Sequence, residues 1–434
     1  MITLFAVWLI PLLGKSKQDG NVQYDIQRRT DLFRKYCTEE PLIGPHWDEL
    51  NSELSKELDG SILTTALHFR LFKHLHQKYL KEELPQEPGF DVYQKLERKL
   101  FPWLVRDGDV RKIAPKNERG IVIATGQRYF PMAVHTIRSL RLWNCTLPVE
   151  IFHLGGDDLH QESRDFLARL PNVSLIDVGT VFNMTILDLK SWDIKPFAVL
   201  GSSFREVILV DADVVFTENP SVLFDYDEYK STGTVFFRDR FFISRTADYA
   251  AWFEKIIPHP HSEKLQKTRM YRGETNYEQE SGVVVIDKGR RLMGLLATCL
   301  LNCKKERGDI HANTHGEKET FWIGFEIAEE PYEYLEEQAG VVGVAVRLAQ
   351  TGQTILCGHV AHFDKTGKLL WFNDGIVEDK KALIMNVGEF KHVENNGNWL
   401  GMCLAVNTLR QIPAEQSKMI DRMKELWVTN PAVQ

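Results

Sequence analysis

Apolar and polar residues follow a regular succession of elements from about residue 119 onward. Short apolar runs of strand length alternate with amphipathic stretches of helix length, the pattern of an α/β domain with a mostly parallel sheet. The expected strands cover residues 119–125, 148–154, 173–178, 206–216, 233–240, 281–288, 342–348 and 354–363, and the first helices cover 130–143 and 160–170. We expect these strands to form a sheet that is too long for a small module.

The segments on either side of this region have a different pattern. Residues 15–116 are charged and helical in periodicity, and we expect them to form a stem or a cap on the following domain. Residues 117–405 form the expected α/β domain, and residues 406–434 form a tail with a helix near 415–427. Residues 1–14 are uncharged and almost wholly apolar, like the hydrophobic part of a signal peptide or signal anchor; a buried N-terminal helix or strand is the alternative.

Composition narrows the class of protein. The chain has 434 residues, of which 43% are hydrophobic and 26% charged, and this excludes a disordered protein. The net charge of −7, without long runs of lysine or arginine, argues against nucleic acid as a partner. Glycosylation sequons at Asn144, Asn172 and Asn183 and an even number of cysteines fit a secretory compartment, but leave open whether the thiols are bridged or buried and free.

The strand at residues 206–216 contains the clearest candidate chemistry. It leads into Asp211 and Asp213, which share a face of an extended chain and can bind one hard divalent cation together. Such a cation can hold a diphosphate, so the pattern suggests an enzyme that uses a sugar nucleotide with Mn²⁺ or Mg²⁺. The alternative is a strand end with two solvated acids before the turn at 217–220.

A second group of candidates lies in residues 358–371. A histidine at a strand end can supply a nitrogen ligand to Mn²⁺, and the glycine turn that follows, with Gly367 and Lys368, can contact diphosphate oxygens. His359 or His362 taken singly is more simply a core or surface residue. Combined with the two acids, His362 is the expected third metal ligand.

Glutamates form a third group of candidates. Glu280 precedes an expected strand, while Glu317 and Glu319 open an expected helix. Acids at a helix start often serve only the helix dipole, which is the interpretation we favour for Glu317. Glu280 and Glu319 become candidates only if the fold brings them to the sugar.

Several segments, taken in order and spacing, resemble the fungal Golgi mannosyltransferases that add terminal α-1,3-linked mannose. The segments are residues 119–126, 147–150, 195–198, 210–213, 236–240, 279–288, 318–322 and 357–362. The resemblance implies a GT-A type nucleotide-sugar-binding fold, a GDP-mannose donor, Mn²⁺, a mannosylated glycan acceptor and retention of anomeric configuration. It also implies a type II protein of the Golgi membrane, anchored by its N-terminal segment, with a lumenal catalytic domain.

The resemblance also assigns roles to residues by position. The resemblance implies that the metal is bound by Asp211, Asp213 and His362, and that the nucleotide lies near Thr125, Gly126 and Lys195. It implies that Gly367 and Lys368 contact the diphosphate. The implied carboxylate at the sugar is Glu319, and Glu280 is the alternative.

Three other functions remain open at this stage. One is an α-1,2-mannosyltransferase or another Golgi glycosyltransferase, and another is a non-catalytic subunit that binds glycan or sugar nucleotide. A third is a phosphatase of the haloacid-dehalogenase type, with Asp211 as nucleophile and Asp213 as acid. That class expects its motif near the start of the domain, whereas three βα units precede it here.

Overall fold

The computed structural model describes residues 61–432, apart from 85–87, 105–109, 114–116, 244–246 and 383–384. The apolar segment at residues 1–14 lies outside the described residues. Among the described residues, none of the helices combines the length and the hydrophobicity that crossing a membrane requires.

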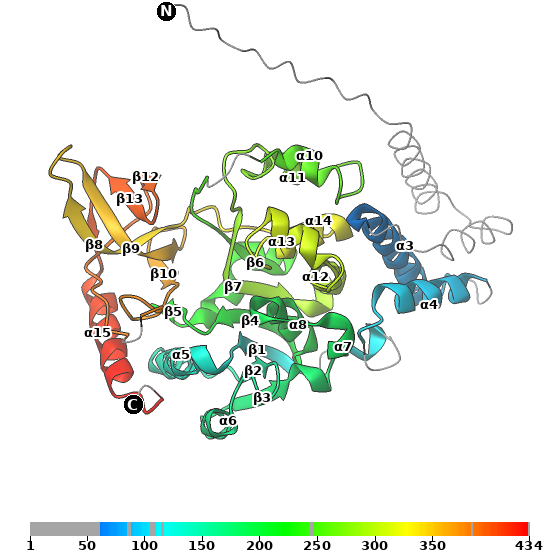
Figure 1. The fold of residues 1–434 in the computed structure, drawn as a ribbon, viewed down its shortest axis with the longest axis horizontal. Helices are drawn as coiled ribbons and strands as arrows, with labels where there is room; N and C mark the ends of the chain where they lie inside the picture. The colour runs from blue at the N-terminus through cyan, green and yellow to red at the C-terminus, as the bar shows by residue number, and fades with distance from the viewer. Residues whose placement is uncertain are drawn as a thin grey trace, which may run out of the picture.

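A six-stranded sheet with the order β3-β2-β1-β4-β7-β6 forms the centre of the protein (Figure 1). Its strands are β1 (Asn117–Ala124), β2 (Val149–His153), β3 (Val173–Asp177), β4 (Phe204–Asp211), β6 (Thr234–Arg238) and β7 (Gln279–Asp287). β3, β2, β1 and β4 are parallel, and β7 is antiparallel to both of its neighbours, β4 and β6. The predicted α/β fold with a mostly parallel central sheet is therefore confirmed.

Helices cover both faces of this sheet. The helices of the described residues are α3 (Ile62–Leu80), α4 (Gly89–Leu100), α5 (Phe130–Leu142), α6 (Gln161–Ala168), α7 (Met184–Leu187), α8 (Ile194–Gly201), α9 (Asp227–Thr232), α10 (Tyr249–Phe253), α11 (Glu263–Lys267), α12 (Lys288–Leu301), α13 (Arg307–Asn313), α14 (Thr320–Ala328) and α15 (Ala414–Val428). Along β4, Val207 and Leu209 pack in the core with α8, α12 and α14, while Ile208 and Val210 pack in a second core with α5. This alternation explains why the strand is apolar at each position from Val207 to Val210, since both of its faces are buried there.

The strands after residue 340 form a second sheet and do not extend the central one. It contains β8 (Gly340–Arg347), β9 (Thr354–Phe363), β10 (Leu369–Phe372), β11 (His392–Glu394), β12 (Asn398–Leu400), β13 (Cys403–Val406) and β14 (Arg410–Gln411), joined to β5 (Val215–Phe216). The expectation of one long sheet is corrected here: β8 and β9 form an antiparallel hairpin whose outer edges pair with β11, β13 and β10. The link to the central region is β5, which follows the acid pair and pairs with β10.

The flanking helices are integrated with the domain rather than separate from it. In Figure 1, α3 and α4 lie at one end of the molecule, and α15 lies with the second sheet at the other. α3 shares the core with α12 and α14, and Arg70 on α3 donates to the backbone oxygen of Ile327 at 3.0 Å. α15 packs on α5, where the imidazole of His135 lies 2.9 Å from the oxygen of Met423. The described part of the N-terminal region therefore packs on the domain, and its designation as a stem or a cap stays a prediction.

One disulfide holds the second sheet together. Cys357 on β9 and Cys403 on β13 are register partners and are bonded to each other, at a sequence separation of 46. Cys145, Cys299 and Cys303 are buried free thiols, and Cys37 lies outside the described residues.

Replacing both bridged cysteines with serine should destabilise the protein. A loop of this length corresponds to about 4 kcal/mol of unfolding free energy in the chain-entropy model, because the bridge restricts the unfolded chain. Thermal unfolding of C357S/C403S should therefore occur at a lower temperature than that of the wild type. Dithiothreitol should lower the thermal midpoint of the wild type but not that of C357S/C403S, which has no bridge to reduce. The Cys145→Ala variant controls for the loss of a thiol, and equal midpoints for the wild type and the double variant would contradict the prediction.

Candidate functional site

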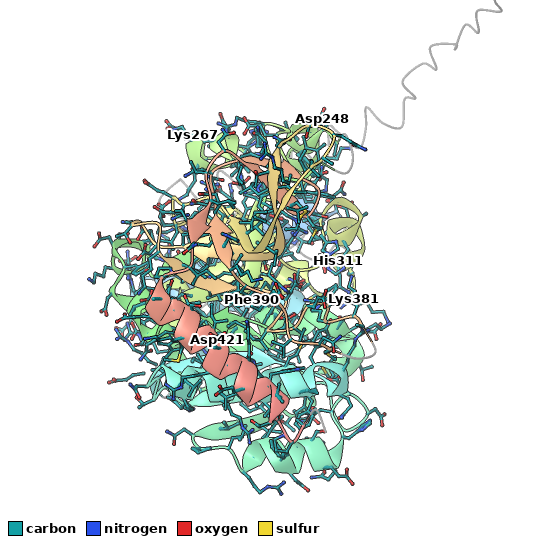
Figure 2. The ribbon with its side chains drawn as sticks, turned by 90° about the vertical axis from the view of Figure 1, so that its left-hand side faces the viewer. Asp248, Lys267, His311, Lys381, Phe390 and Asp421 are labelled. Atoms are coloured by element: carbon teal, nitrogen blue, oxygen red, sulfur yellow. A yellow bond between two sulfur atoms is a disulfide. The ribbon has the colours of Figure 1, made fainter. Side chains whose placement is uncertain are left out.

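A cavity of about 570 Å³ opens where the central sheet meets the second sheet. The central part of the chain contributes Lys195, Asp211, Asp239, Glu280, Ser281, Glu317 and Lys318 to it, and the second sheet and its loops contribute His359, Asn373, Asp374, Lys380 and Lys381. Asp211 ends β4, and ligands of parallel sheets bind at such carboxyl ends. Figure 2 views the protein from the side of the second sheet and α15 and labels Lys381.

Lys195 organises the inner wall of the cavity. It is one of the buried residues of α8, and its ammonium lies 2.8 Å from Asp211 Oδ1 and 2.7 Å from Glu317 Oε1. It also donates to the hydroxyl of Ser281 at 3.0 Å, and that hydroxyl donates to Glu317 Oε1 at 2.9 Å. Burial opposes the charge on Lys195, but the two carboxylates outweigh it and raise the pKa of the ammonium overall. The positive charge at this position is therefore permanent.

The acids of the cavity outnumber what the lysines can neutralise. Burial raises the pKa of Asp211 to about 6, in spite of the opposing effect of Lys195. Burial, with the nearby charge of Asp239, raises the pKa of Glu280 to about 7. Both carboxyl groups therefore lie where burial disfavours their charged form, and a cation placed beside them would favour it.

Asp213 is joined to the second sheet through Lys380. The ammonium of Lys380 pairs with Asp213 Oδ2 and lies 2.6 Å from Asp374 Oδ1. Burial opposes the charge on Lys380, but these two acids raise its pKa overall. Asp374 and Lys380 come from the loop after β10, where no motif marks them in the sequence.

The structure brings His359, and not His362, to the cavity. The two residues are three apart on β9, so their side chains lie on opposite faces of the strand. His359 Nδ1 is buried without a hydrogen-bond partner and lies 3.9 Å from Asp374 Oδ2. His362 stacks on Trp371, with ring centroids 4.0 Å apart, and burial lowers its pKa to about 3. His362, the third ligand that the sequence predicts, therefore does not line the cavity, whereas His359 of the same motif does.

Gly367 and Lys368 also lie away from the cavity lining. They belong to the hairpin turn between β9 and β10, where the Gly367 amide donates to the oxygen of Asp364 at 2.8 Å. The Lys368 ammonium pairs with Glu218 at 2.6 Å on the surface. The turn that the sequence suggests for diphosphate binding therefore serves the hairpin, and Lys380 is the lysine from this region that reaches the acids.

Thr125 and Gly126 lie at the same edge of the sheet as the acid pair. They follow Ala124, which is the register partner of Asp211 in the pairing of β1 with β4. Tyr129, from the same turn, lines the cavity. A side chain at Gly126 would bring its Cβ within 2.4 Å of Asp158 Oδ1 and would displace this carboxylate.

Of the three candidate glutamates, Glu280 and Glu317 line the cavity and Glu319 does not. Glu319 is fully buried and accepts hydrogen bonds from the amides of Glu278 and Gln279 and from the Trp322 indole, at 3.1, 3.2 and 2.7 Å. It does not line the cavity, whereas Glu280 does. Glu317, which the helix-start interpretation set aside, lines the cavity through its contact with Lys195.

Aromatic side chains form another part of the lining, which the sequence did not indicate. Tyr277 and Phe242 stack with ring centroids 5.4 Å apart, and the Lys318 ammonium lies 3.5 Å from the Tyr277 ring centroid. Lys318 also pairs with Asp239 at 2.5 Å. Flat aromatic faces beside charged groups suit the binding of a sugar or a base.

Donor types that a divalent cation accepts lie in and beside the cavity: the carboxylates of Asp211, Asp213 and Asp374 and the Nδ1 atom of His359. In the described part of the chain, no three of them offer ligand atoms that all lie within 4.8 Å of one another, so a bound ion would have to draw them closer. Carboxylates suit Mg²⁺ and Mn²⁺, and one imidazole among them favours Mn²⁺ over Mg²⁺.

Comparison with known proteins identifies relatives. The chain is similar to "Putative alpha-1,3-mannosyltransferase MNN15" of Candida albicans, with 28% identity over 393 residues, which cover 75% of this chain and 51% of the relative. It is similar to "Alpha-1,3-mannosyltransferase MNN1" of Saccharomyces cerevisiae, with 26% identity over 312 residues, which cover 59% and 40%. The chain therefore spans about half or less of the length of these relatives.

Similarity to solved structures is low. A crystal structure of the glycosyltransferase GlyE of Streptococcus pneumoniae matches with a TM-score of 0.31 and 15% identity, covering 51% of this chain and 45% of GlyE. The galactosyltransferase LgtC matches with a TM-score of 0.29 and 15% identity, covering 48% and 70%. The family assignment rests on the sequence alone: the model described as "Mannosyltransferase putative" matches residues 118–364 of the 434. Because this match spans more than half of the chain, the protein belongs to that mannosyltransferase family.

Proposed function

We propose that this protein transfers mannose from GDP-mannose to a mannose-containing glycan and forms an α-1,3 linkage with retention of configuration. The observation that carries the proposal is the acid-rich cavity at the end of β4 in a chain of the mannosyltransferase family: Asp211 lines the cavity, and Asp213 pairs with Lys380 of its wall. The names of the relatives support the linkage, and the resemblance in the sequence supports the donor.

A metal ion is the proposed cofactor, Mn²⁺ or else Mg²⁺. Asp211, Asp213 and His359 would hold it, with Asp374 as a further carboxylate beside them. When bound, such an ion supplies positive charge to the diphosphate leaving group.

Lys195 and Lys380 orient the acids that would hold the metal ion. Lys195 holds Asp211 by an ion pair and so fixes the direction of its free oxygen. Lys380, which pairs with Asp213 and Asp374, is placed to exchange one of these acids for a diphosphate oxygen when the donor binds. Thr125 and Gly126, at the edge next to Asp211, are the proposed neighbours of the nucleotide.

Glu280 is the proposed carboxylate at the sugar. It lines the cavity and its Oε1 lies 3.2 Å from the amide nitrogen of Asn373, which holds its orientation. As an ionised group it can stabilise positive charge on the anomeric carbon or act as a nucleophile on it. In the other route to retention, the leaving phosphate deprotonates the acceptor hydroxyl, and Glu280 acts only through its charge.

The proposed location is the Golgi membrane, with type II topology and a lumenal catalytic domain. The disulfide between Cys357 and Cys403 supports an oxidising compartment. The asparagines of the three sequons, Asn144, Asn172 and Asn183, are exposed, as a glycosylated lumenal protein requires.

The direct test is a panel of nucleotide sugars offered to the purified protein with Mn²⁺ and a mannosylated acceptor. GDP-mannose should be the donor that is turned over, and linkage analysis of the product should give α-1,3-mannose. Asp213→Asn should reduce turnover by about a hundredfold or more, because it removes a metal ligand without changing size. Preference for another nucleotide sugar would overturn the donor assignment.

The two histidines of β9 allow a matched comparison. His359→Gln should raise the Mn²⁺ concentration that gives half-maximal turnover by about tenfold or more, since it removes a metal ligand. His362→Phe keeps an aromatic ring against Trp371 and should leave this concentration unchanged. Metal titrations of both variants, with thermal midpoints to verify folding, make the comparison. A metal defect in His362→Phe with normal metal dependence in His359→Gln would reverse the assignment.

The two glutamates allow a second comparison. Glu280→Gln should reduce kcat by about a hundredfold, because a neutral amide cannot provide the negative charge. Since the pKa of Glu280 is raised to about 7, wild-type turnover should fall as the pH drops below about 7 and the carboxylate becomes protonated. This acidic limb should be absent in Glu280→Gln. Glu319→Gln should lower the thermal midpoint but keep the pH profile, and the opposite pattern would make Glu319 the functional acid.

A further inference from the structure

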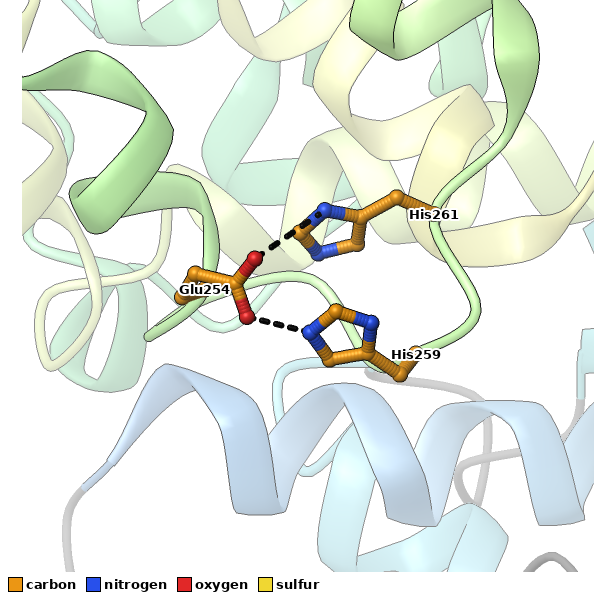
Figure 3. Close-up of side chains that lie close together, drawn as sticks. All are labelled: Glu254, His259 and His261. Carbon is orange, nitrogen blue, oxygen red and sulfur yellow. Dashed lines mark hydrogen bonds and ion pairs between the residues drawn. The ribbon is translucent and has the colours of Figure 1, made fainter.

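A second group of metal-binding side chains lies outside the cavity. Glu254 follows α10, and His259 and His261 lie in the loop that leads to α11 (Figure 3). One ligand atom from each residue lies within 4.8 Å of the corresponding atoms of the other two. None of the three residues lines the cavity of the proposed function.

The orientation of His261 is fixed by its surroundings. Only 2% of its side chain is exposed, and its Nε2 lies 3.2 Å from the oxygen of Ile257. Since a backbone oxygen only accepts, this contact places the proton on Nε2 and leaves a lone pair on Nδ1. Nδ1 lies 3.6 Å from Glu254 Oε1. A metal-bound histidine typically has this arrangement, with its other nitrogen donating to a carbonyl oxygen.

His259 and Glu254 complete the arrangement. The imidazole of His259 stacks on that of His261 with centroids 4.2 Å apart and planes 12° from parallel. Its Nε2 contacts Glu254 Oε2, so the two rings contact the two oxygens of one carboxylate. The contact between His259 and Glu254 requires a proton, and a metal ion can replace that proton.

We propose that Glu254, His259 and His261 bind one Zn²⁺ ion, with water as the remaining ligand. Two imidazole nitrogens and one carboxylate oxygen suit Zn²⁺, which prefers nitrogen ligands, and are poorly suited to Mg²⁺. The positive charge of Arg70 acts on His261 from α3, but Arg70 pairs with Glu329 at 2.9 Å, which reduces its opposition to a cation.

The position of the site gives the ion a structural role. The cluster lies in the segment between β6 and β7. This segment begins at Asp239, directly after β6, and leads into β7, whose second residue is Glu280. Both of these residues line the cavity. Zn²⁺ would connect the end of α10 to the loop before α11 and so stabilise the insertion that supplies this part of the cavity wall.

The test is a zinc titration of the metal-free full chain, followed by calorimetry and by thermal unfolding. To separate the cluster from the acid pair, the measurement is made in the wild type and in D211N/D213N. We expect one Zn²⁺ per chain in D211N/D213N, a further ion at the acid pair in the wild type, and a rise in the thermal midpoint of D211N/D213N on binding, because the ion binds only the folded state. Mn²⁺ should not raise the midpoint of D211N/D213N.

The cluster variants decide the proposal. Each of E254Q, H259Q and H261Q should weaken zinc binding at least tenfold and abolish the shift in midpoint. His160→Gln, an exposed histidine before α6, is the matched control and should change neither. If H261Q does not fold, the variants at the more exposed Glu254 and His259 carry the test. Unchanged zinc affinity in E254Q and H259Q, or loss of zinc binding in D211N/D213N, would overturn the proposal.

Discussion

The short pairing of β5 with β10 is the constraint on which the site depends. Val215 faces Phe372 in this antiparallel pair. Counting two residues back from Val215 and two forward from Phe372 places Asp213 next to Asp374, and the amide of Gly375 donates to the oxygen of Asp213 at 2.6 Å. One backbone register thus joins the acid pair of the central sheet to the polar loop of the second sheet. Without it, the cavity would lack one of its walls.

The electrostatics of the site follow from the burial of several carboxylates close together in the cavity wall. Removing carboxylates from water is costly unless cations accompany them. Lys195 and Lys380 each contact two acids, and this keeps both lysines charged in spite of burial. Burial is the main cause that keeps the pKa values of Asp211 and Glu280 raised in spite of these cations. The proposed divalent ion would add positive charge beside these acids.

The residues of one sequence motif can lie in different parts of the fold, as the segment from His359 to Lys368 shows. The segment from His359 to Lys368 has the composition of a metal and phosphate site, yet the strand divides it between two faces and a hairpin turn takes its glycine and lysine. Glu319 is another residue of a catalytic type that does not reach the cavity, because its buried carboxylate accepts hydrogen bonds from three donors in the interior. A charged residue can thus be essential to the fold around a site without reaching the site.

The sequence by itself determined most strands and helices of the central region and the placement of Asp211 near a functional edge, whereas Lys195 was implied by the family resemblance and Glu280 depended on the fold. These features depend on local periodicity and on the rule that ligands bind at the carboxyl ends of parallel strands. Only the tertiary structure decided that β8 and β9 belong to a second sheet, that His359 faces the cavity in place of His362, and that Lys380 reaches the acids. The reason is that strand pairing and side-chain facing depend on partners far away in the chain, and no local pattern of residues records which partner a strand will find.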